Sequence, residues 1–201
     1  MKIYFLRHEE RYKAMTFFTP LSKQGKKNAL ILGTVLKTLN LTKIYSSPFL
    51  RTLQTIEPYL AISEITVNLE DSIRESNISR MIPETEKYLT LPEELNSQFK
   101  INKEYESFLD IKKVKYPEKN KDIIERFNNF LFNLIKNYSN TEENILIVAH
   151  AGLINNFINK IEKKNPLVSK IKTNCYPSGK ITLIVRDKEL VFEPINWKIK
   201  N

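Results

Sequence analysis

Short apolar runs alternate along this chain with longer segments whose apolar residues recur every three or four positions. Residues 2–6 and 144–149 are continuous apolar stretches too short for a typical helix, and they indicate buried strands. Residues 23–39 and 122–138 carry apolar side chains along one face of a helix. Strands that alternate with amphipathic helices predict an α/β layered domain with a mostly parallel central sheet.

Capping and turn signals predict the neighbouring elements. Ser22 is placed to cap the helix over 23–39, and Pro48 is placed to open another helix after a short strand at 43–46. A further helix is expected to begin at Ala151. Three more strands are expected, at 65–69, 180–186 and 190–193, the last two as a hairpin joined near Asp187 and Lys188.

Residues 70–120 interrupt this alternation. The segment is polar and irregular, and it contains three prolines. It predicts an insertion with one or two short helices that could cover a site. Because no linker and no internal repeat is evident, we expect a single domain over residues 1–201 with an insertion at about 76–118.

Composition restricts the classes of partner and site. Cys175 is the only cysteine of 201 residues, so an intrachain disulfide and a cysteine-based zinc site are excluded. No apolar run approaches the roughly 20 residues of a membrane-spanning helix, and the first run is too short for a signal peptide, so a cytoplasmic protein without a membrane partner is expected. The net charge of +9 would draw in anions, or it reflects an abundance of lysine. The lysines are scattered, which does not favour a nucleic-acid partner.

Both histidines of the chain stand at predicted strand ends. His8 follows the strand over 2–6, and His150 follows the strand over 144–149. In parallel sheets ligands bind beyond the carboxyl ends of the strands, so the two imidazoles are expected to meet in one site.

The residues around the histidines suit phosphoryl transfer. Arg7 precedes His8, and an imidazole can attack phosphorus while guanidinium groups hold the phosphate oxygens. Arg51 lies near the start of a predicted helix, whose N-terminus favours anions. His150 could donate a hydrogen bond to a phosphate oxygen. Each pattern alone is more typical of an ordinary surface or core residue.

Taken in order, the motifs resemble those of the histidine phosphatase superfamily, which is also called phosphoglycerate mutase-like. "FLRHEE" (5–10) resembles the Arg-His-Gly signature, and "LSKQGKKNA" (21–29) resembles the Leu-Thr-x-x-Gly-x-x-Gln-Ala helix start. "SSPFLRTLQT" (46–55) resembles the Ser-Ser-Pro-x-x-Arg-x-x-Gln-Thr segment, and "VAHAGLI" (148–154) resembles the strand end with the second histidine. The resemblance implies a three-layer α/β/α sandwich, phosphoglycerate mutase-like.

The resemblance also implies roles for individual residues. His8 would be the nucleophile that becomes phosphorylated, and Arg7, Arg51 and His150 would form the phosphate pocket. "SIRES" (72–76) matches the family's Leu-x-Glu pattern with Ile73 for leucine, so Glu75 would be the catalytic acid and base.

One position departs from the family pattern. Glu9 stands where the family has glycine, and a carboxylate there should repel phosphate unless it turns away or pairs with Arg11 or another cation. Ala151 replaces the glycine that usually follows the second histidine, which is a milder change.

These features predict a metal-independent phosphatase that acts on a small phosphate monoester through a phosphohistidine on His8, with no cofactor. One alternative is a phosphoglycerate mutase, which passes the phosphoryl group to a substrate hydroxyl in a site closed to water. Another is a weakly active phosphate-binding protein, which Glu9 motivates. A two-histidine metal hydrolase is not favoured, because no His-x-x-x-His or His/Asp cluster is present. Specificity is expected to lie in the loop 9–20 and the insertion, and the oligomeric state is left open.

Overall fold

The computed structural model describes residues 1–14, 16–77, 82–155, 180–186 and 189–194. Its centre is a sheet of six described strands in the order β3-β2-β4-β1-β5-β6. The four strands β3, β2, β4 and β1 run parallel to one another, and β5 and β6 add an antiparallel edge. The predicted α/β class with a mostly parallel sheet is confirmed. The strands are β1 (Lys2–Arg7), β2 (Lys43–Ser46), β3 (Val67–Leu69), β4 (Asn144–Ala149), β5 (Lys180–Arg186) and β6 (Glu189–Pro194).

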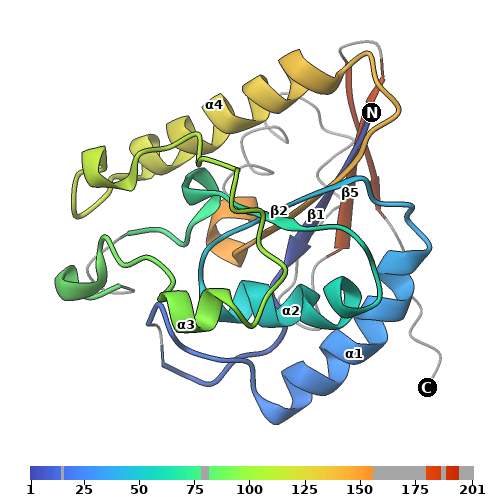
Figure 1. The fold of residues 1–201 in the computed structure, drawn as a ribbon. Helices are drawn as coiled ribbons and strands as arrows, with labels where there is room; N and C mark the ends of the chain where they lie inside the picture. The colour runs from blue at the N-terminus through green and yellow to red at the C-terminus, as the bar shows by residue number, and fades with distance from the viewer. Residues whose placement is uncertain (15, 78–81, 156–179, 187–188, 195–201) are drawn as a thin grey trace.

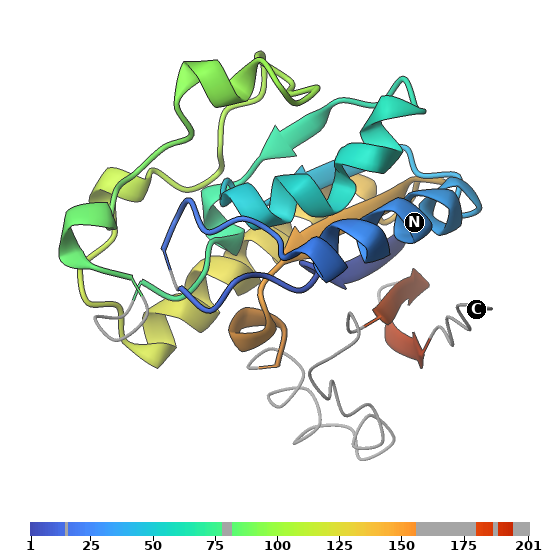
Figure 2. The ribbon, with the colours of Figure 1, turned by 90° about the horizontal axis from the view of Figure 1, so that it is seen from below.

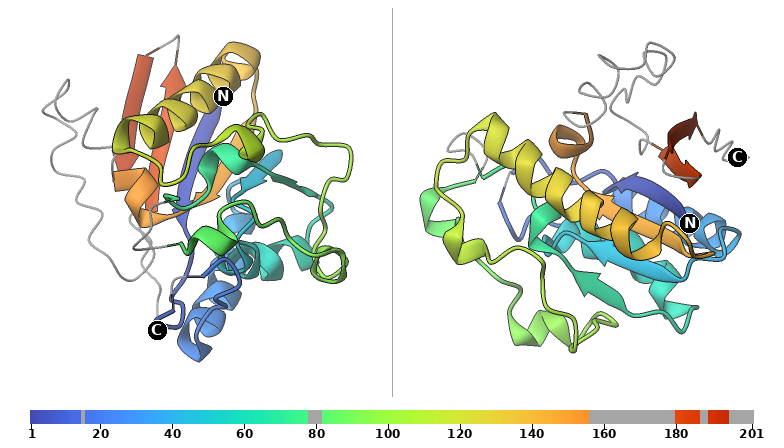
Figure 3. Two further views of the ribbon diagram at one scale, coloured as in Figure 1. Left: turned by 90° about the vertical axis from the view of Figure 1, so that its left-hand side faces the viewer. Right: turned by 90° about the horizontal axis from the view of Figure 1, so that it is seen from above.

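Helices cover both faces of the sheet. The helices α1 (Lys23–Lys37) and α2 (Leu50–Ala61) pack together on one face, which Figure 2 shows from below. The helix α4 (Asn120–Tyr138) lies over the opposite face, as the view from above in Figure 3 shows. No described helix is both long and apolar enough to cross a membrane.

The alternating side chains of β1 explain these layers. Ile3 and Phe5 point into the core cluster that α4 covers, whereas Tyr4 and Leu6 point into the cluster that α1 and α2 cover. All four side chains are buried, which explains why the sequence of the strand is apolar without alternation. The predicted three-layer sandwich is confirmed.

The register of the parallel strands sets the level of the site. Arg7 of β1 is paired with Ala149 of β4, so the next residues, His8 and His150, leave neighbouring strands at the same height. The amide of His8 still donates to the Ala149 carbonyl at 3.1 Å, which extends the ladder to the histidine.

The insertion passes between α2 and the N-terminal end of α4 (green in Figure 1). It contains one short helix, α3 (Glu93–Asn96), as expected, together with 3₁₀ turns such as Glu84–Glu86 and Ile111–Lys113. An isolated parallel bridge between Val67 and Ile101 joins it to the edge strand β3.

Several predicted boundaries need correction. The first strand extends to Arg7, the helix expected from 122 begins at Asn120, and the last strand spans Glu189–Pro194. The third strand begins at Val67 and not at 65, and the first helix ends at Lys37 and not at 39. The helix α2 begins at Leu50 and not at Pro48, because the backbone is still extended at Phe49. The predicted hairpin pairing of β5 with β6 is confirmed, but its turn at residues 187–188 lies outside the described residues. The helix expected after His150 does begin at 151 and is described through 155.

Candidate active site

The two histidines face each other at the carboxyl end of the parallel strands. Their ring centroids are 5.3 Å apart, and the rings meet edge to face at 61°. His8 is 3% exposed and His150 is fully buried. The strand ends therefore bring together two imidazoles that lie 142 positions apart in the sequence, and they do so inside the protein.

A backbone carbonyl selects the tautomer of His8. Its Nδ1 lies 2.7 Å from the carbonyl oxygen of Glu9, which can only accept a hydrogen bond. The proton of the neutral ring is therefore on Nδ1, and Nε2 carries a free electron pair. Burial, together with the positive charge of Arg51, lowers the pKa of His8 well below its usual value, so the ring is neutral near pH 7.

One ring nitrogen of His150 is hydrogen-bonded to a serine, and the other has no hydrogen-bond partner among the described residues. Its Nε2 lies 2.8 Å from the hydroxyl of Ser47, whereas the buried Nδ1 lies 3.5 Å from Oε2 of Glu75. Burial and then the charge of Arg51 lower the pKa of His150 well below its usual value. A neutral ring at this position has one N–H that it can donate to a ligand.

Arg51 supplies a buried positive charge from the first turn of α2. The residue is 1% exposed, and its guanidinium carbon lies 4.6 Å from the centre of the Phe49 ring. Burial lowers the pKa of Arg51 to about 10, so it remains charged near pH 7. One Nη donates to the Thr16 carbonyl at 2.9 Å, while Nε has no hydrogen-bond partner. That buried donor is available to a bound anion.

Glu75 completes the cluster from the segment that follows β3. Its Oε2 is 3.8 Å from Nη2 of Arg51, and the residue is 7% exposed. Gly152 lies against it, since a Cβ added at that glycine would be 3.4 Å from Oε1 of Glu75. The helix after His150 thus begins directly beside the carboxylate.

Arg7 is the last residue of β1 and borders the same space. Its positive charge contributes to lowering the pKa of both His8 and His150, which places it within electrostatic reach of both rings. The residues predicted for the site, His8, His150, Arg51, Glu75 and Arg7, are therefore gathered at one end of the sheet.

Sequence reasoning did not assign roles to the residues that hold this cluster. Thr55 of α2 accepts a hydrogen bond from the amide of Glu9 at 2.9 Å, and Gln54 accepts one from the amide of Leu21 at 2.8 Å. The Gln-Thr end of the motif at 46–55 thus fastens both ends of the loop that follows His8. The order of these residue types in the motif was the available signal.

The side chain of Glu9 is directed toward α1. Its Oε2 accepts a hydrogen bond from the amide of Asn28 on α1 at 3.3 Å, and the side chain is buried. Arg11 does not pair with it, because that guanidinium donates instead to the carbonyls of residues 12, 13 and 14. Of the two expected ways to avoid repelling phosphate, the structure has the first.

The described residues contain no group of three or more histidine, cysteine or acidic side chains that could hold a metal ion. The positive charge within this site comes from arginines on β1 and α2.

Solved structures with this fold include both phosphatases and a mutase. Ecdysone phosphate phosphatase from Bombix mori, in complex with tungstate, is 13% identical, with a TM-score of 0.72 over 100% of this chain and 95% of that chain. A phosphoglycerate mutase from Bacillus anthracis is 21% identical, with a TM-score of 0.68 over 97% and 92% of the two chains. Mycobacterial glucosyl-3-phosphoglycerate phosphatase, in complex with inorganic phosphate, is 15% identical, with a TM-score of 0.63 over 98% and 96%.

A search of curated protein sequences finds no match. The family model of the histidine phosphatase superfamily (branch 1), by contrast, matches residues 4–191, which is nearly the whole chain. The predicted family is thereby confirmed: this protein belongs to the histidine phosphatase superfamily.

Proposed function

We propose that this protein is a metal-independent phosphatase that hydrolyses small phosphate monoesters through a phosphohistidine on His8. The observation that carries the proposal is the tautomer of His8, whose Nδ1 is engaged by the Glu9 carbonyl at 2.7 Å and whose Nε2 is left as a nucleophile. A neutral, buried imidazole needs no deprotonation before it attacks phosphorus.

In the first step, Nε2 of His8 forms a bond to phosphorus while the bond from phosphorus to the ester oxygen breaks. Arg51, Arg7 and the N–H of His150 hold the phosphoryl oxygens and neutralise their charge. Glu75 gives a proton to the departing oxygen, which leaves as an alcohol.

In the second step, water attacks the phosphorus and the phosphorus–nitrogen bond breaks. The Glu75 carboxylate accepts a proton from that water, His8 regains its free electron pair, and inorganic phosphate is released. Two of the similar structures, both of phosphatases, hold tetrahedral or related oxyanions, which is consistent with a pocket of this kind.

Phosphoryl transfer to a second hydroxyl, as in a mutase, is the second candidate. The near-complete burial of His8, Arg51 and His150 favours it, because a mutase must exclude water from its phosphoenzyme. A similar fold is found in a phosphoglycerate mutase. The two candidates share the first step and differ in the acceptor of the second.

The test is to incubate the wild-type protein and His8→Ala with a panel of phosphate esters, with and without a chelator, and to trap acid-labile, base-stable phosphate on the protein. We expect labelling and phosphate release in the wild type, with or without the chelator, and neither in His8→Ala. Transfer to an added alcohol or phosphoglycerate in place of phosphate release would favour the mutase. Tight phosphate binding without any labelled histidine would refute both candidates and leave a binding protein.

A further inference from the structure

A buried ion pair outside the candidate site joins α4 to the insertion. Arg126 and Glu118 are 8% and 5% exposed. Nε of the arginine lies 2.7 Å from Oε1 of the glutamate, and Nη2 lies 3.1 Å from Oε2, so the two planar groups meet through two parallel hydrogen bonds. The charge of Arg126 also contributes, after burial and the charges of Arg51 and His8, to lowering the pKa of His150.

The remaining donors of Arg126 hold the backbone that carries Glu75. Its Nη1 donates to the carbonyl of Ser72 at 2.6 Å. Its Nη2 also reaches the carbonyls of Arg74, at 3.2 Å, and Glu75, at 3.4 Å. One guanidinium therefore binds three carbonyls of a short stretch that, beyond the 3₁₀ turn Asp71–Ile73, has no helix or strand to fix it.

Glu118 fastens the other end of the same stretch. Its Oε2 accepts a hydrogen bond from the amide of Asn77 at 2.7 Å, and its own amide donates to the Asn77 carbonyl at 2.9 Å. Residues 72–77 are thus bracketed on both sides by one ion pair, with Glu75 in the middle.

Stability alone does not account for this pair. Burying two charges costs desolvation free energy, and apolar side chains of similar size often stabilise a core equally well. A guanidinium, by contrast, presents five donors in a fixed plane, which suits the orientation of several carbonyls at once. Misplacement of a catalytic group by about 1 Å can cost about 10²-fold in rate.

We propose that Arg126 is a positioning residue for the carboxyl group of Glu75, and that Glu118 orients Arg126. The inference rests on the proposed function, in which Glu75 protonates the leaving oxygen. It gives the insertion a part in the chemistry, because Glu118 lies at its C-terminal end.

The test separates proton donation from the rest of the reaction by the choice of leaving group. Nitrophenolate departs without a proton, whereas the alkoxide of glycerol 2-phosphate needs one. We expect Arg126→Lys, which keeps the charge and loses the planar fork, to slow the single-turnover formation of phosphohistidine from glycerol 2-phosphate about 10²-fold. From p-nitrophenyl phosphate we expect the same step to slow less than about threefold. The first step is measured by itself because Glu75 is also the base of the second step, which both esters share.

Glu118→Gln keeps one acceptor and should give the same pattern with a smaller loss on glycerol 2-phosphate. It also stands in for Arg126→Lys if that variant fails to fold. Glu125→Gln, an exposed position next to Arg126 on α4, is the matched control and should change neither ester. Equal losses on both esters would show a merely structural role and overturn the inference, as would unchanged kinetics on both.

The inference and the proposed function fail in different ways. If the wild type forms no phosphohistidine, the proposed function is wrong. If it does, and Glu75→Gln slows phosphohistidine formation from glycerol 2-phosphate alone while the Arg126 and Glu118 variants do not, only the positioning role is wrong.

Discussion

The strand ends and the segment after β3 hold their functional side chains by different means. His8 and His150 are placed by strand pairing, since they directly follow Arg7 and Ala149, which are partners in the β1–β4 ladder. The segment that carries Glu75 has no such ladder and is held by side chains, among them Arg126. The site therefore has two halves. The rigid half, His8 and His150, is positioned by backbone pairing, whereas the position of Glu75 depends on individual polar contacts.

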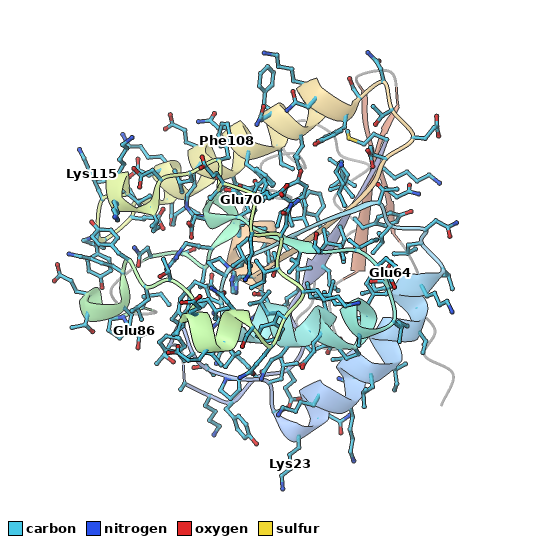
Figure 4. The ribbon with its side chains drawn as sticks, viewed as in Figure 1. Lys23, Glu64, Glu70, Glu86, Phe108 and Lys115 are labelled. Atoms are coloured by element: carbon cyan, nitrogen blue, oxygen red, sulfur yellow. The ribbon has the colours of Figure 1, made fainter. Side chains whose placement is uncertain are left out.

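Glu70 is the second side chain that holds the insertion. It is fully buried at the end of β3 and accepts hydrogen bonds from Ser72, Tyr105, Ser107 and Phe108. Figure 4 labels Glu70 and Phe108, whose backbone amide donates to the Glu70 carboxylate at 2.9 Å. This buried carboxylate with four donors ties residues 105–108 to the sheet edge.

The comparison predicts its largest effect at Arg51, where the rigid half meets the substrate. Arg51→Lys keeps the charge and loses the fork that can hold two phosphate oxygens, so kcat/KM should fall about 10²-fold. Steady-state kinetics on p-nitrophenyl phosphate would measure it. Arg11→Lys is the control, because that guanidinium donates to carbonyls of its own loop and a lysine keeps its charge, and it should change kcat/KM less than about threefold. Equal losses in the two variants would contradict a phosphate-binding role for Arg51.

A second prediction concerns Glu70, whose loss should affect stability first. Glu70→Gln turns one acceptor into a donor that faces other donors, and it should lower the free energy of unfolding by about 2 kcal/mol. For a protein of this size that is about 4–8 °C in Tm. Urea and thermal unfolding would measure it, with the exposed Glu64→Gln as the control. An unchanged Tm would mean that the four donors find other partners and that the insertion is not held at this point.

The third prediction is that stability depends on pH because of the two histidines at the strand ends. Both histidines have pKa values lowered mainly by burial, so below about pH 6.5 the unfolded chain takes up protons that the folded one does not. Stability should therefore fall as the pH drops from 6.5 toward 5, by up to about 1.4 kcal/mol per pH unit for each histidine.

Urea unfolding at pH 7.5, 6.5 and 5.5 would measure this slope. His8→Asn removes one of the two groups and should roughly halve the slope, without changing its sign. If His8→Asn leaves the change of unfolding free energy with pH unaltered, the pH dependence comes from other groups. Burial of the His8 ring would then not make stability depend on pH.

The same contrast explains which parts of the molecule could be predicted. The meeting of His8 and His150 followed from strand order and register, which apolar patterning reveals. Glu75 could be predicted only from the family motif, because a loop has no periodic pattern of apolar residues. The bonds of Arg126 to residues 72–75 join parts of the chain more than 50 positions apart, and no local pattern encodes them. The start of α2 was misplaced because Pro48, a good helix opener, lies in a bend between β2 and α2, and the backbone at Phe49 is still extended.

The smallest predicted effect tests whether backbone pairing alone fixes the rigid half. Ser22 caps α1: its hydroxyl accepts from the amide of Gly25 at 3.0 Å and donates to the Glu10 carboxylate at 2.6 Å. The Glu10 carbonyl packs so closely on Gly25 that an added Cβ would lie 2.0 Å from it, so this cap also anchors the loop after His8.

Ser22→Ala should lower the free energy of unfolding by about 1 kcal/mol, the usual cost of a lost cap. Ser22→Thr keeps the hydroxyl and should restore most of it. Because His8 is held independently by its bond to the Ala149 carbonyl, phosphohistidine formation at saturating substrate should change less than about twofold in Ser22→Ala. A larger loss of labelling would mean that the rigid half also relies on single side chains, and the contrast between strand ends and insertion would then be one of degree.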